Sequence, residues 1–232
     1  MKRVLVAEDE SSIREFIVIN LKHNGYDVVD VDDGAKALDE YFSSNENFDI
    51  ALLDIMMPEV DGLEVCKRLR EDNKYIGIIM LTAKTQEMDK VSCLLMGADD
   101  YITKPFSPSE LVARLDAVYR RVAMNSNNNQ NTNNTLDSGD FALNLRNRSL
   151  SHRGEMVELT QVEFQIMEYF FENQGVALSR TDILKKVWGE GRIGEEKIVD
   201  VNIRRLRMKI EDEPSSPKHI VTIWGVGYKW VN

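Results

Sequence analysis

The sequence predicts an α/β fold with a doubly wound, five-stranded parallel sheet, followed by a smaller α+β domain. Strand and helix patterns alternate five times before residue 123, an Asn-rich segment then interrupts the chain, and shorter strand and helix patterns follow it. Alternation of strand and helix is typical of a parallel sheet with helices on both faces. A chain of 232 residues has room for about two domains.

Short apolar runs predict the strands of the first domain, at 3–7, 27–31, 49–53, 77–81 and 100–103. An amphipathic segment follows each run, at 12–23, 34–44, 62–71, 86–96 and 108–122. In the last segment, Leu111, Leu115 and Val118 recur at helical spacing. Asp61-Gly62 and Met96-Gly97 are turn signals between these elements.

Residues 123–135 are expected to form a flexible linker between a domain at 1–122 and a domain at 136–232. The segment 125–135 contains only Asn, Ser, Gln and Thr, so it cannot bury apolar surface to offset the entropy of ordering. Beyond it, alternating segments at 141–145 and 156–159 flank Arg153-Gly154 and predict a small antiparallel sheet.

Three helices are expected in the second domain. Thr160 and Glu163 match a capping box at the start of the first helix, whose aromatic stripe we assign to the core. Ser179 precedes the second helix as a cap, and the third runs from about 195 to 211. Gly225 and Gly227 mark the end of a hairpin.

The charge of the chain is divided unevenly. Residues 1–122 carry 24 acidic and 15 basic residues, a net charge of −9, whereas residues 123–232 carry 15 and 14, a net charge of −1. Within the second domain, Lys197–Lys209 holds five basic residues and one acidic residue. A local basic face of this kind is the footprint of nucleic-acid binding, and the net charge of −10 conceals it.

Composition indicates a cytoplasmic protein without membrane insertion. No apolar run approaches the roughly 18 residues of a membrane span, and Met1-Lys2-Arg3 leads directly into a strand without a secretory signal. Cys66 and Cys93 lie in helical patterns without metal-type spacing, so we assign both to the core.

A helical wheel at about 100° per residue divides the third helix into two faces. Val199, Ile203, Leu206 and Ile210 fall within about 40° of one another and form the buried stripe. The opposite face holds Lys197, Val201, Arg204 and Met208, with Arg205 on its flank. Such an Arg-rich stripe suits the major groove of DNA, although a basic helix face is more often simply solvated.

Reactive residues stand at the ends of the apolar runs of the first domain. Glu8 and Asp9 end the first run, Asp54 the third, Thr82 the fourth and Lys104 the fifth. The carboxyl ends of parallel strands share one edge of the sheet, where ligands bind. Clustered carboxylates favour a hard cation such as Mg²⁺, and another carboxylate can attack phosphorus. Each residue alone could be a cap or loop residue, but together they predict an aspartyl phosphate site.

The first 121 residues resemble a response-regulator receiver domain, which is flavodoxin-like. The motifs that carry the resemblance are Glu8-Asp9, Leu53-Asp54, Met57-Pro58, Asp61-Gly62, Leu81-Thr82-Ala83, Gly97-Ala98-Asp99-Asp100-Tyr101 and Lys104-Pro105-Phe106. The resemblance implies that Glu8, Asp9, Asp54 and the backbone carbonyl of Met56 surround Mg²⁺. It also implies that Asp54 accepts a phosphoryl group from a phosphohistidine of a sensor histidine kinase, that Thr82 and Lys104 bind its oxygens, and that Tyr101 rotates as a switch.

Residues 136–232 resemble the winged-helix effector domain of OmpR/PhoB response regulators, through Leu159–Phe164, Val199–Lys209 and Gly225–Tyr228. The resemblance implies that the third helix enters the major groove, that the loop before it touches RNA polymerase, and that the hairpin wing approaches the minor groove. The residues expected on DNA are Lys197 and Val201, Arg205 at bases, Arg204 and Arg207 at phosphates, and Thr222 near the wing.

Trp224 departs from the family pattern, because many members carry Arg before the Gly-x-Gly-Tyr of the wing. Arg would be drawn to a narrow minor groove, and an indole lacks that charge. Two roles stay open for Trp224: contact with the sugar-phosphate backbone, which we favour, and packing in the core.

The function expected is that of a DNA-binding transcriptional regulator of a two-component system, controlled by phosphorylation, that catalyses only its own phosphorylation and dephosphorylation. The resemblance implies a homodimer when phosphorylated, with Lys90–Glu110, Asp100–Arg114 and Asp99–Arg121 ion pairs between subunits.

Two other classes of protein fit the sequence less well. An Asp-nucleophile phosphatase would carry its nucleophile after the first strand, and here Asp54 follows the third. An orphan regulator would use its receiver only for dimerisation, against which the intact acidic site argues. The P-loop pattern Gly-x-x-x-x-Gly-Lys-Ser/Thr is missing.

Overall fold

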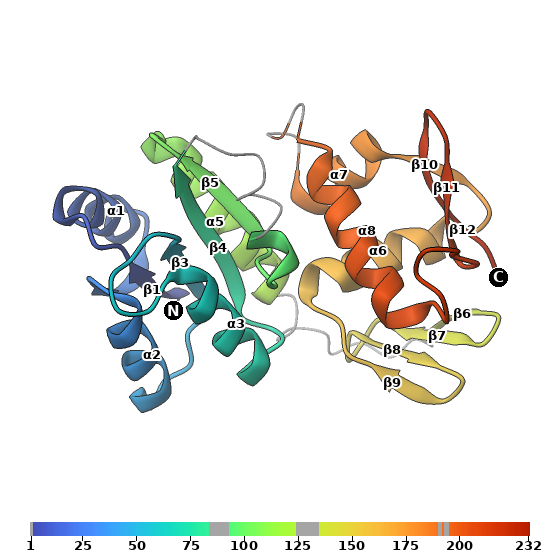
Figure 1. The fold of residues 1–232 in the computed structure, drawn as a ribbon, viewed down its shortest axis with the longest axis horizontal. Helices are drawn as coiled ribbons and strands as arrows, with labels where there is room; N and C mark the ends of the chain where they lie inside the picture. Colours follow the sequence, from blue (N-terminus) through green and yellow to red (C-terminus); the bar gives the residue numbers. More distant parts are fainter. Residues whose placement is uncertain (1, 84–92, 124–134, 190–191, 193–194) are drawn as a thin grey trace. The chain divides into compact units, whose positions relative to one another are not determined.

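The computed structural model describes residues 2–83, 93–123, 135–189, 192 and 195–232. The chain divides into two compact units, Met1–Ala123 and Met124–Asn232 (Figure 1). No helix among the described residues is both long and apolar enough to cross a lipid bilayer.

The first unit contains a five-stranded parallel sheet in the order β2-β1-β3-β4-β5. The strands are β1 (Lys2–Ala7), β2 (Tyr26–Val31), β3 (Ile50–Asp54), β4 (Gly77–Ala83) and β5 (Asp100–Lys104). The helices are α1 (Ser11–His23), α2 (Gly34–Ser43), α3 (Gly62–Asp72) and α5 (Pro108–Ala123). The predicted doubly wound fold is confirmed, while the expected helix at 86–96 falls mostly outside the described residues.

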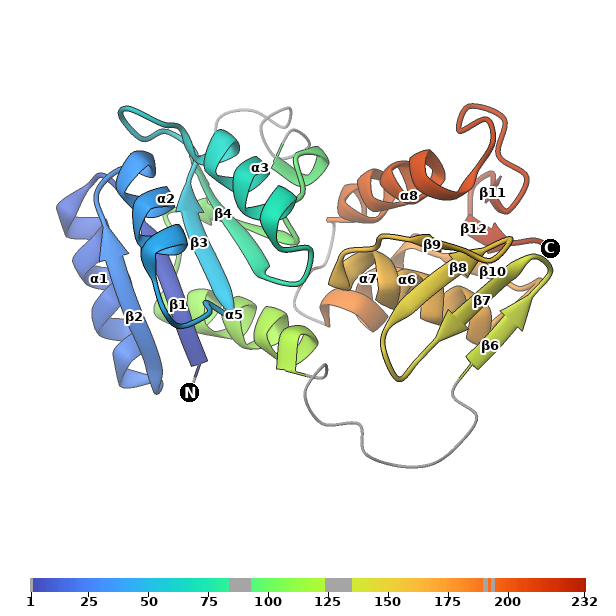
Figure 2. The same cartoon turned by 90° about the horizontal axis from the view of Figure 1, so that it is seen from below.

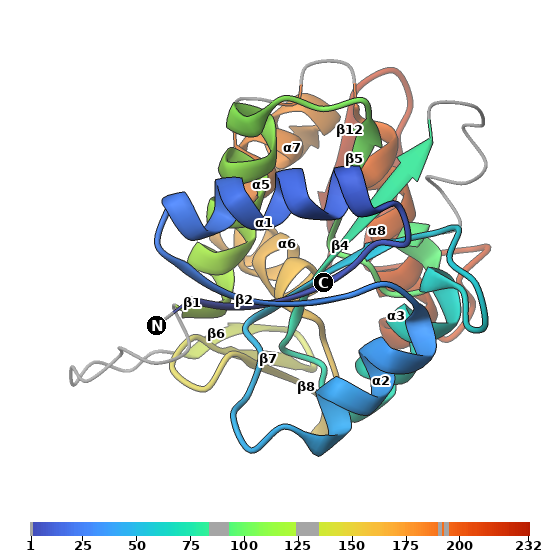
Figure 3. The same ribbon diagram turned by 90° about the vertical axis from the view of Figure 1, so that its left-hand side faces the viewer.

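Helices cover both faces of this sheet. Figure 3 shows the strands nearly edge-on, with α1 and α5 on one side and α2 and α3 on the other. All five residues of β3 are buried, which explains the continuous apolar run that precedes Asp54. The order reverses between β1 and β3, and this switch point is where doubly wound sheets bind ligands.

Two helices of the first unit begin at Asp caps. The carboxylate of Asp33 accepts the backbone N–H of Lys36, and that of Asp61 accepts the backbone N–H of Glu64. Gly62, the first residue of α3, is pressed against the end of β3, because a Cβ there would lie 1.9 Å from the carbonyl oxygen of Asp54. The glycine therefore fixes how closely α3 approaches the acidic site.

The described residues of the second unit form antiparallel strands and three helices. Its first sheet has the order β6 (Thr135–Ser138), β7 (Phe141–Asn144), β8 (Ser149–His152) and β9 (Glu155–Val157). Figure 2 shows this sheet beside α6 (Gln161–Glu172). There follow β10 (Ala177–Ser179), α7 (Arg180–Trp188), α8 (Lys197–Ile210), β11 (Ile220–Ile223) and β12 (Gly227–Trp230), and the second sheet has the order β10-β12-β11.

The two end residues of the expected linker at 123–135 belong to regular elements, and residues 124–134 lie outside the described residues. Ala123 still belongs to α5, and Thr135 already begins β6. Thr135 pairs with Asn144 of β7, and this backbone pairing gives order to a residue that its composition assigns to the linker.

Core packing in the second unit follows the predicted stripes. The capping box of Thr160 and Glu163 is present at the start of α6. The aromatic stripe of α6 is buried, and Phe171 packs against Trp230, whose indole is 0% exposed. The prediction of an aromatic core is confirmed.

Candidate functional site

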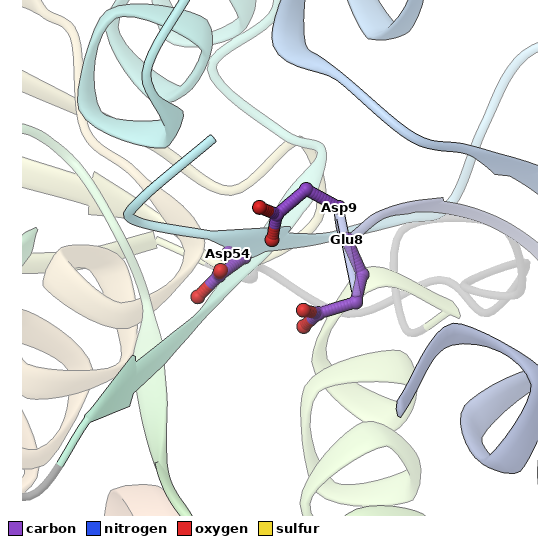
Figure 4. Close-up of side chains that lie close together, drawn as sticks. All are labelled: Glu8, Asp9 and Asp54. Atoms are coloured by element: carbon purple, nitrogen blue, oxygen red, sulfur yellow. The ribbon is translucent and has the colours of Figure 1, made fainter. Parts of the chain in front are cut away.

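Three carboxylates meet where the first and third strands end (Figure 4). Glu8 and Asp9 follow β1, and Asp54 is the last residue of β3, which pairs directly with β1. Each of these residues offers a carboxylate oxygen that lies within 4.8 Å of the other two. Glu8 and Asp54 are buried, whereas Asp9 is exposed and keeps one side of the cluster accessible.

A lysine from the fifth strand joins this cluster. The Nζ atom of Lys104 lies 2.7 Å from Oε2 of Glu8 and 3.1 Å from Oδ1 of Asp54. Thr82 is buried at the end of β4, one residue after Leu81, which is the register partner of Asp54. The Thr82 hydroxyl donates a hydrogen bond of 3.1 Å to the backbone carbonyl of Ala83.

Burial and crowding set the electrostatics of the cluster. Burial raises the pKa of Glu8 and of Asp54 above their ordinary values, and the Lys104 ammonium opposes both shifts. Burial alone would lower the pKa of Lys104, but its contacts with the two carboxylates outweigh that and raise it. The cluster combines three carboxyl groups with a single ammonium, so acidic groups outnumber basic ones. Oxygen ligands with this acidic excess fit a hard divalent cation.

Other residues at this edge were expected from the family resemblance. The side chain of Met56, two residues after β3, is exposed, and the expected role of its backbone carbonyl stays a prediction. Tyr101 is buried in β5. Its expected rotation stays a prediction.

One supporting residue was missed by sequence reasoning. Arg14 of α1 donates to the backbone carbonyl of Glu8 over 2.7 Å and to that of Asp9 over 3.3 Å, so it holds the loop that presents the two acids. Its position in the first turns of an amphipathic helix carries no local signal of that role.

The residues expected at a dimer interface have partners within the chain. Arg114 lies 2.7 Å from Glu110 and 3.9 Å from Asp100. Asp99 is buried, and its Oδ2 atom lies 2.8 Å from Nη2 of Arg70. Arg121 is also buried, and its Nε donates to the carbonyl of Ala117. Lys90 lies outside the described residues, and the inter-subunit pairs stay predictions.

The predicted DNA-facing stripe of α8 is only partly exposed. Lys197, Arg204 and Met208 are exposed, as the wheel predicts. Val201 is buried, which corrects its expected position beside them. The core stripe of Val199, Ile203, Leu206 and Ile210 is confirmed.

Two arginines of α8 lie elsewhere than expected. Arg205 is 8% exposed, and its Nη2 lies 3.1 Å from Oε1 of Glu163, a fully buried carboxylate of α6. The flank position of Arg205 on the wheel faces α6, and a buried carboxylate requires a compensating charge. The expected contact of Arg205 with bases stays a prediction, and in this structure its guanidinium faces Glu163.

Arg207 has a structural role in the same helix. Its guanidinium donates to the carbonyl of Ile220 over 3.0 and 2.6 Å and to the hydroxyl of Thr222 over 2.9 Å. These hydrogen bonds connect α8 to β11. They engage the guanidinium that was expected to contact a DNA phosphate. Thr222 is half-buried, so part of its side chain still reaches the surface.

The wing carries the most exposed large apolar side chain of the described residues. Trp224, between β11 and β12, is 90% exposed. Packing of Trp224 in the core, one of its two open roles, is thus excluded in this structure.

A polar network joins the three segments around the wing. Arg180, the first residue of α7, donates to Oδ1 of Asp200 on α8 over 2.7 Å, and the hydroxyl of Tyr228 on β12 donates to the same oxygen over 2.8 Å. The Arg180 guanidinium also lies 4.8 Å from the centre of the Tyr228 ring. Sequence reasoning missed this network, because its members come from three separate segments.

Comparison with known families agrees with both units. Residues 4–116 match the model of the response regulator receiver domain, and residues 154–230 match that of the C-terminal domain of transcriptional regulatory proteins. The chain is a response regulator of the OmpR/PhoB type. The receiver domain of this response regulator implies a kinase partner, its effector domain implies DNA, and the family acts as transcription factors rather than as enzymes.

Solved structures share the whole two-domain architecture of this response regulator. A cysteine-substituted mutant of RitR is 25% identical, with a TM-score of 0.74, and the match covers 100% of this chain and 99% of RitR. DrrB from Thermotoga maritima, an OmpR/PhoB homologue, is 29% identical over 100% of both chains, with a TM-score of 0.52. A member of a family of redox sensors in the streptococci is 25% identical, with a TM-score of 0.50 over 100% and 99%.

Proposed function

We propose that this response regulator accepts a phosphoryl group on Asp54 from a phosphohistidine of a sensor histidine kinase in the cytoplasm. The observation that carries the proposal is the position of the Asp54 carboxylate, beside two further carboxylates and 3.1 Å from the Lys104 ammonium. A nucleophilic oxygen and a cation for the incoming phosphoryl oxygens thus stand at one strand edge.

The transfer is a displacement at phosphorus. An oxygen of Asp54 forms a bond to phosphorus, the P–N bond to the kinase imidazole breaks, and the electron pair of that bond stays on the imidazole nitrogen. Lys104 leaves its contact with Asp54 to bind a phosphoryl oxygen, and the Thr82 hydroxyl donates to another. Tyr101, the switch residue, then rotates into the space that the Thr82 side chain leaves.

The carboxylates of Glu8, Asp9 and Asp54, with the backbone carbonyl of Met56, would hold Mg²⁺. When bound, the cation neutralises charge that builds up on the phosphoryl oxygens. Lys104 stabilises the buried acids between rounds of phosphorylation, since its ammonium contacts both Glu8 and Asp54.

The output is regulated binding of promoter DNA by a phosphorylated homodimer. The exposed Lys197 and Arg204 of α8, together with Thr222 and Trp224 of the wing, are the residues that we assign to DNA contact. RNA polymerase would bind the loop before α8. The dimer would form through the surface that includes Glu110 and Arg114 of α5.

Intact-mass spectrometry tests the phosphorylation step. Incubation with acetyl phosphate and Mg²⁺ should add one phosphoryl group to the wild-type chain. Asp54→Ala should abolish the addition, and Asp9→Ala or chelation of Mg²⁺ should reduce it strongly. Equal labelling of wild type and Asp54→Ala would show that another residue is the acceptor.

A further inference from the structure

Glu8 and Asp9 are consecutive residues, yet both belong to the acidic cluster. Each offers a carboxylate oxygen within 4.8 Å of the other and of Asp54 (Figure 4). Consecutive side chains of an extended strand point to opposite faces of the sheet. The backbone leaves the strand directly after Ala7, where β1 ends. Convergence of the three acids therefore depends on the backbone conformation of the segment 8–10.

Regular structure holds this segment only at its start. The backbone N–H of Glu8 donates to the carbonyl of Val31 over 3.2 Å, which extends the pairing of β1 with β2 by one residue. Glu10 is the N-cap of α1, and among the described residues its side chain makes no capping hydrogen bond to the helix. A side-chain cap therefore does not fix the approach of the segment to α1.

Arg14 supplies contacts to this segment from the first turns of α1. Its Nη1 atom donates to the carbonyl of Glu8 over 2.7 Å and to that of Asp9 over 3.3 Å. Its Nε atom lies 3.5 Å from Oδ2 of Asp30 in β2. Because a guanidinium presents its donors in fixed directions, the pair with Asp30 on one edge orients the donors on the other.

The charge of Arg14 and its geometry would act on a metal ion in opposite directions. A cation near the acidic cluster repels Mg²⁺, so charge alone would make Arg14 weaken metal binding. Donation to the two carbonyls instead favours the conformation in which the carboxylates converge, and ligands that are already placed lose less entropy when they bind. The carboxylate of Asp30 offsets the charge of Arg14, so the geometric effect should dominate.

We infer that Arg14 and Asp30 are positioning residues for the metal. The Asp30 carboxylate orients the Arg14 guanidinium, and the guanidinium holds the backbone of Glu8 and Asp9 so that both acids face Asp54. The inference rests on the Mg²⁺ site of the proposed function. It gives β2, an edge strand outside the acidic cluster, a share in the metal affinity.

Calorimetric titration of the full-length protein with MgCl₂ tests the inference by the sign of the change. Arg14→Met should weaken Mg²⁺ binding about tenfold, although it removes a positive charge. Arg14→Lys keeps the charge but not the planar set of donors, and it should weaken binding about threefold. Arg68→Met is the matched control, because exposed Arg68 pairs with Glu64 on the surface of α3, and it should change the affinity less than about twofold.

A double-mutant cycle tests the part of Asp30. Asp30→Asn alone should weaken Mg²⁺ binding about threefold, and it should have little further effect in the Arg14→Met background, because Asp30 acts through Arg14. Full additivity of the two substitutions would mean that Asp30 acts on the metal by its own charge, and it would remove Asp30 from the inference.

Phosphorylation by acetyl phosphate provides a second readout. In Arg14→Met, the Mg²⁺ concentration for half-maximal labelling should rise about tenfold, while the rate at saturating Mg²⁺ stays that of wild type. Tighter or unchanged Mg²⁺ binding by both Arg14 variants would overturn the inference, as would a lower saturating rate at an unchanged half-maximal concentration. A wild-type protein that binds Mg²⁺ but is not labelled would contradict the proposed phosphorylation alone, and calorimetry would still decide the role of Arg14. A wild-type protein that binds no Mg²⁺ would overturn both.

Discussion

Glu163 and Arg205 form an ion pair in the interior of the effector domain, with Oε1 of Glu163 3.1 Å from Nη2 of Arg205. The other carboxylate oxygen of Glu163 accepts a hydrogen bond of 2.6 Å from Nζ of Lys209 and one of 2.8 Å from the backbone N–H of Thr160. One buried side chain therefore closes the N-terminus of α6 and holds two basic residues of α8. This carboxylate therefore links the start of α6 to the buried flank of α8.

Removal of Arg205 should destabilise the effector domain. Arg205→Ala removes one of the two cations that contact Glu163 among the described residues, which we expect to lower the free energy of unfolding by about 2 kcal/mol. Arg204→Ala, at the neighbouring exposed position, should change it by about 0.5 kcal/mol or less. Urea unfolding followed by tryptophan emission measures both, and equal midpoints would contradict the role of the ion pair.

The same carboxylate should make the effector domain sensitive to acid. Burial alone would raise the pKa of Glu163, but Arg205, Lys209 and the capping hydrogen bond outweigh it and hold the pKa below the ordinary value of 4.5. Its contribution to stability is then fully present above pH 4.5 and is lost as the pH falls through the folded-state pKa. Glu163→Gln should lose this pH dependence, and an unfolding profile identical to that of wild type would contradict the prediction.

Lys104 should compete with Mg²⁺ for the acidic cluster. Its Nζ atom lies 2.7 Å from Glu8 and 3.1 Å from Asp54, so Lys104→Met removes a cation that must otherwise share these oxygens. We expect Mg²⁺ to bind about tenfold more tightly to this variant, a gain of about 1.4 kcal/mol. Isothermal titration calorimetry measures the affinity, with the exposed Lys22→Met as control. Unchanged or weaker binding by Lys104→Met would mean that the lysine does not compete.

The dimer prediction has a control within one helix. Arg114→Glu should weaken dimerisation of the phosphorylated protein about tenfold or more, because every contact in a two-fold interface occurs twice. Arg114 also forms an ion pair with Glu110 in the same helix. A double variant that carries both Glu110→Lys and Arg114→Glu exchanges the two charges and preserves that pair. The double variant should stay monomeric by sedimentation velocity. Dimers as stable as those of wild type would place the interface on another face.

Local patterns of the sequence predicted the architecture and the phosphoacceptor edge. Apolar runs followed by amphipathic segments determine the strands and helices, and the carboxyl ends of parallel strands have to meet at one edge of the sheet. Glu8, Asp54 and Lys104 therefore came together as expected, although they are far apart in the chain. The capping box of Thr160 and Glu163 was readable for a similar reason, since it lies within one helical turn.

Positions on the surface of α8 were harder to predict. The wheel gives the angle of each side chain about the helix axis, but the element that lies at that angle is not encoded locally. Arg207 at its position could face DNA or β11, and only the packing of the hairpin decided for β11. Likewise, the strand pattern of the wing allowed Trp224 to point into the core or into water.

The sequence by itself thus determined the two-domain fold, the acidic cluster and the capped helices, because each depends on periodicity, local hydrogen bonding or the order of strands in a parallel sheet. Only the tertiary structure decided the inward turn of Arg205 and the exposure of Trp224. The first depends on a buried carboxylate from another helix, and the second on a turn fixed by pairing among three strands. Both are long-range contacts, which no window of the sequence contains.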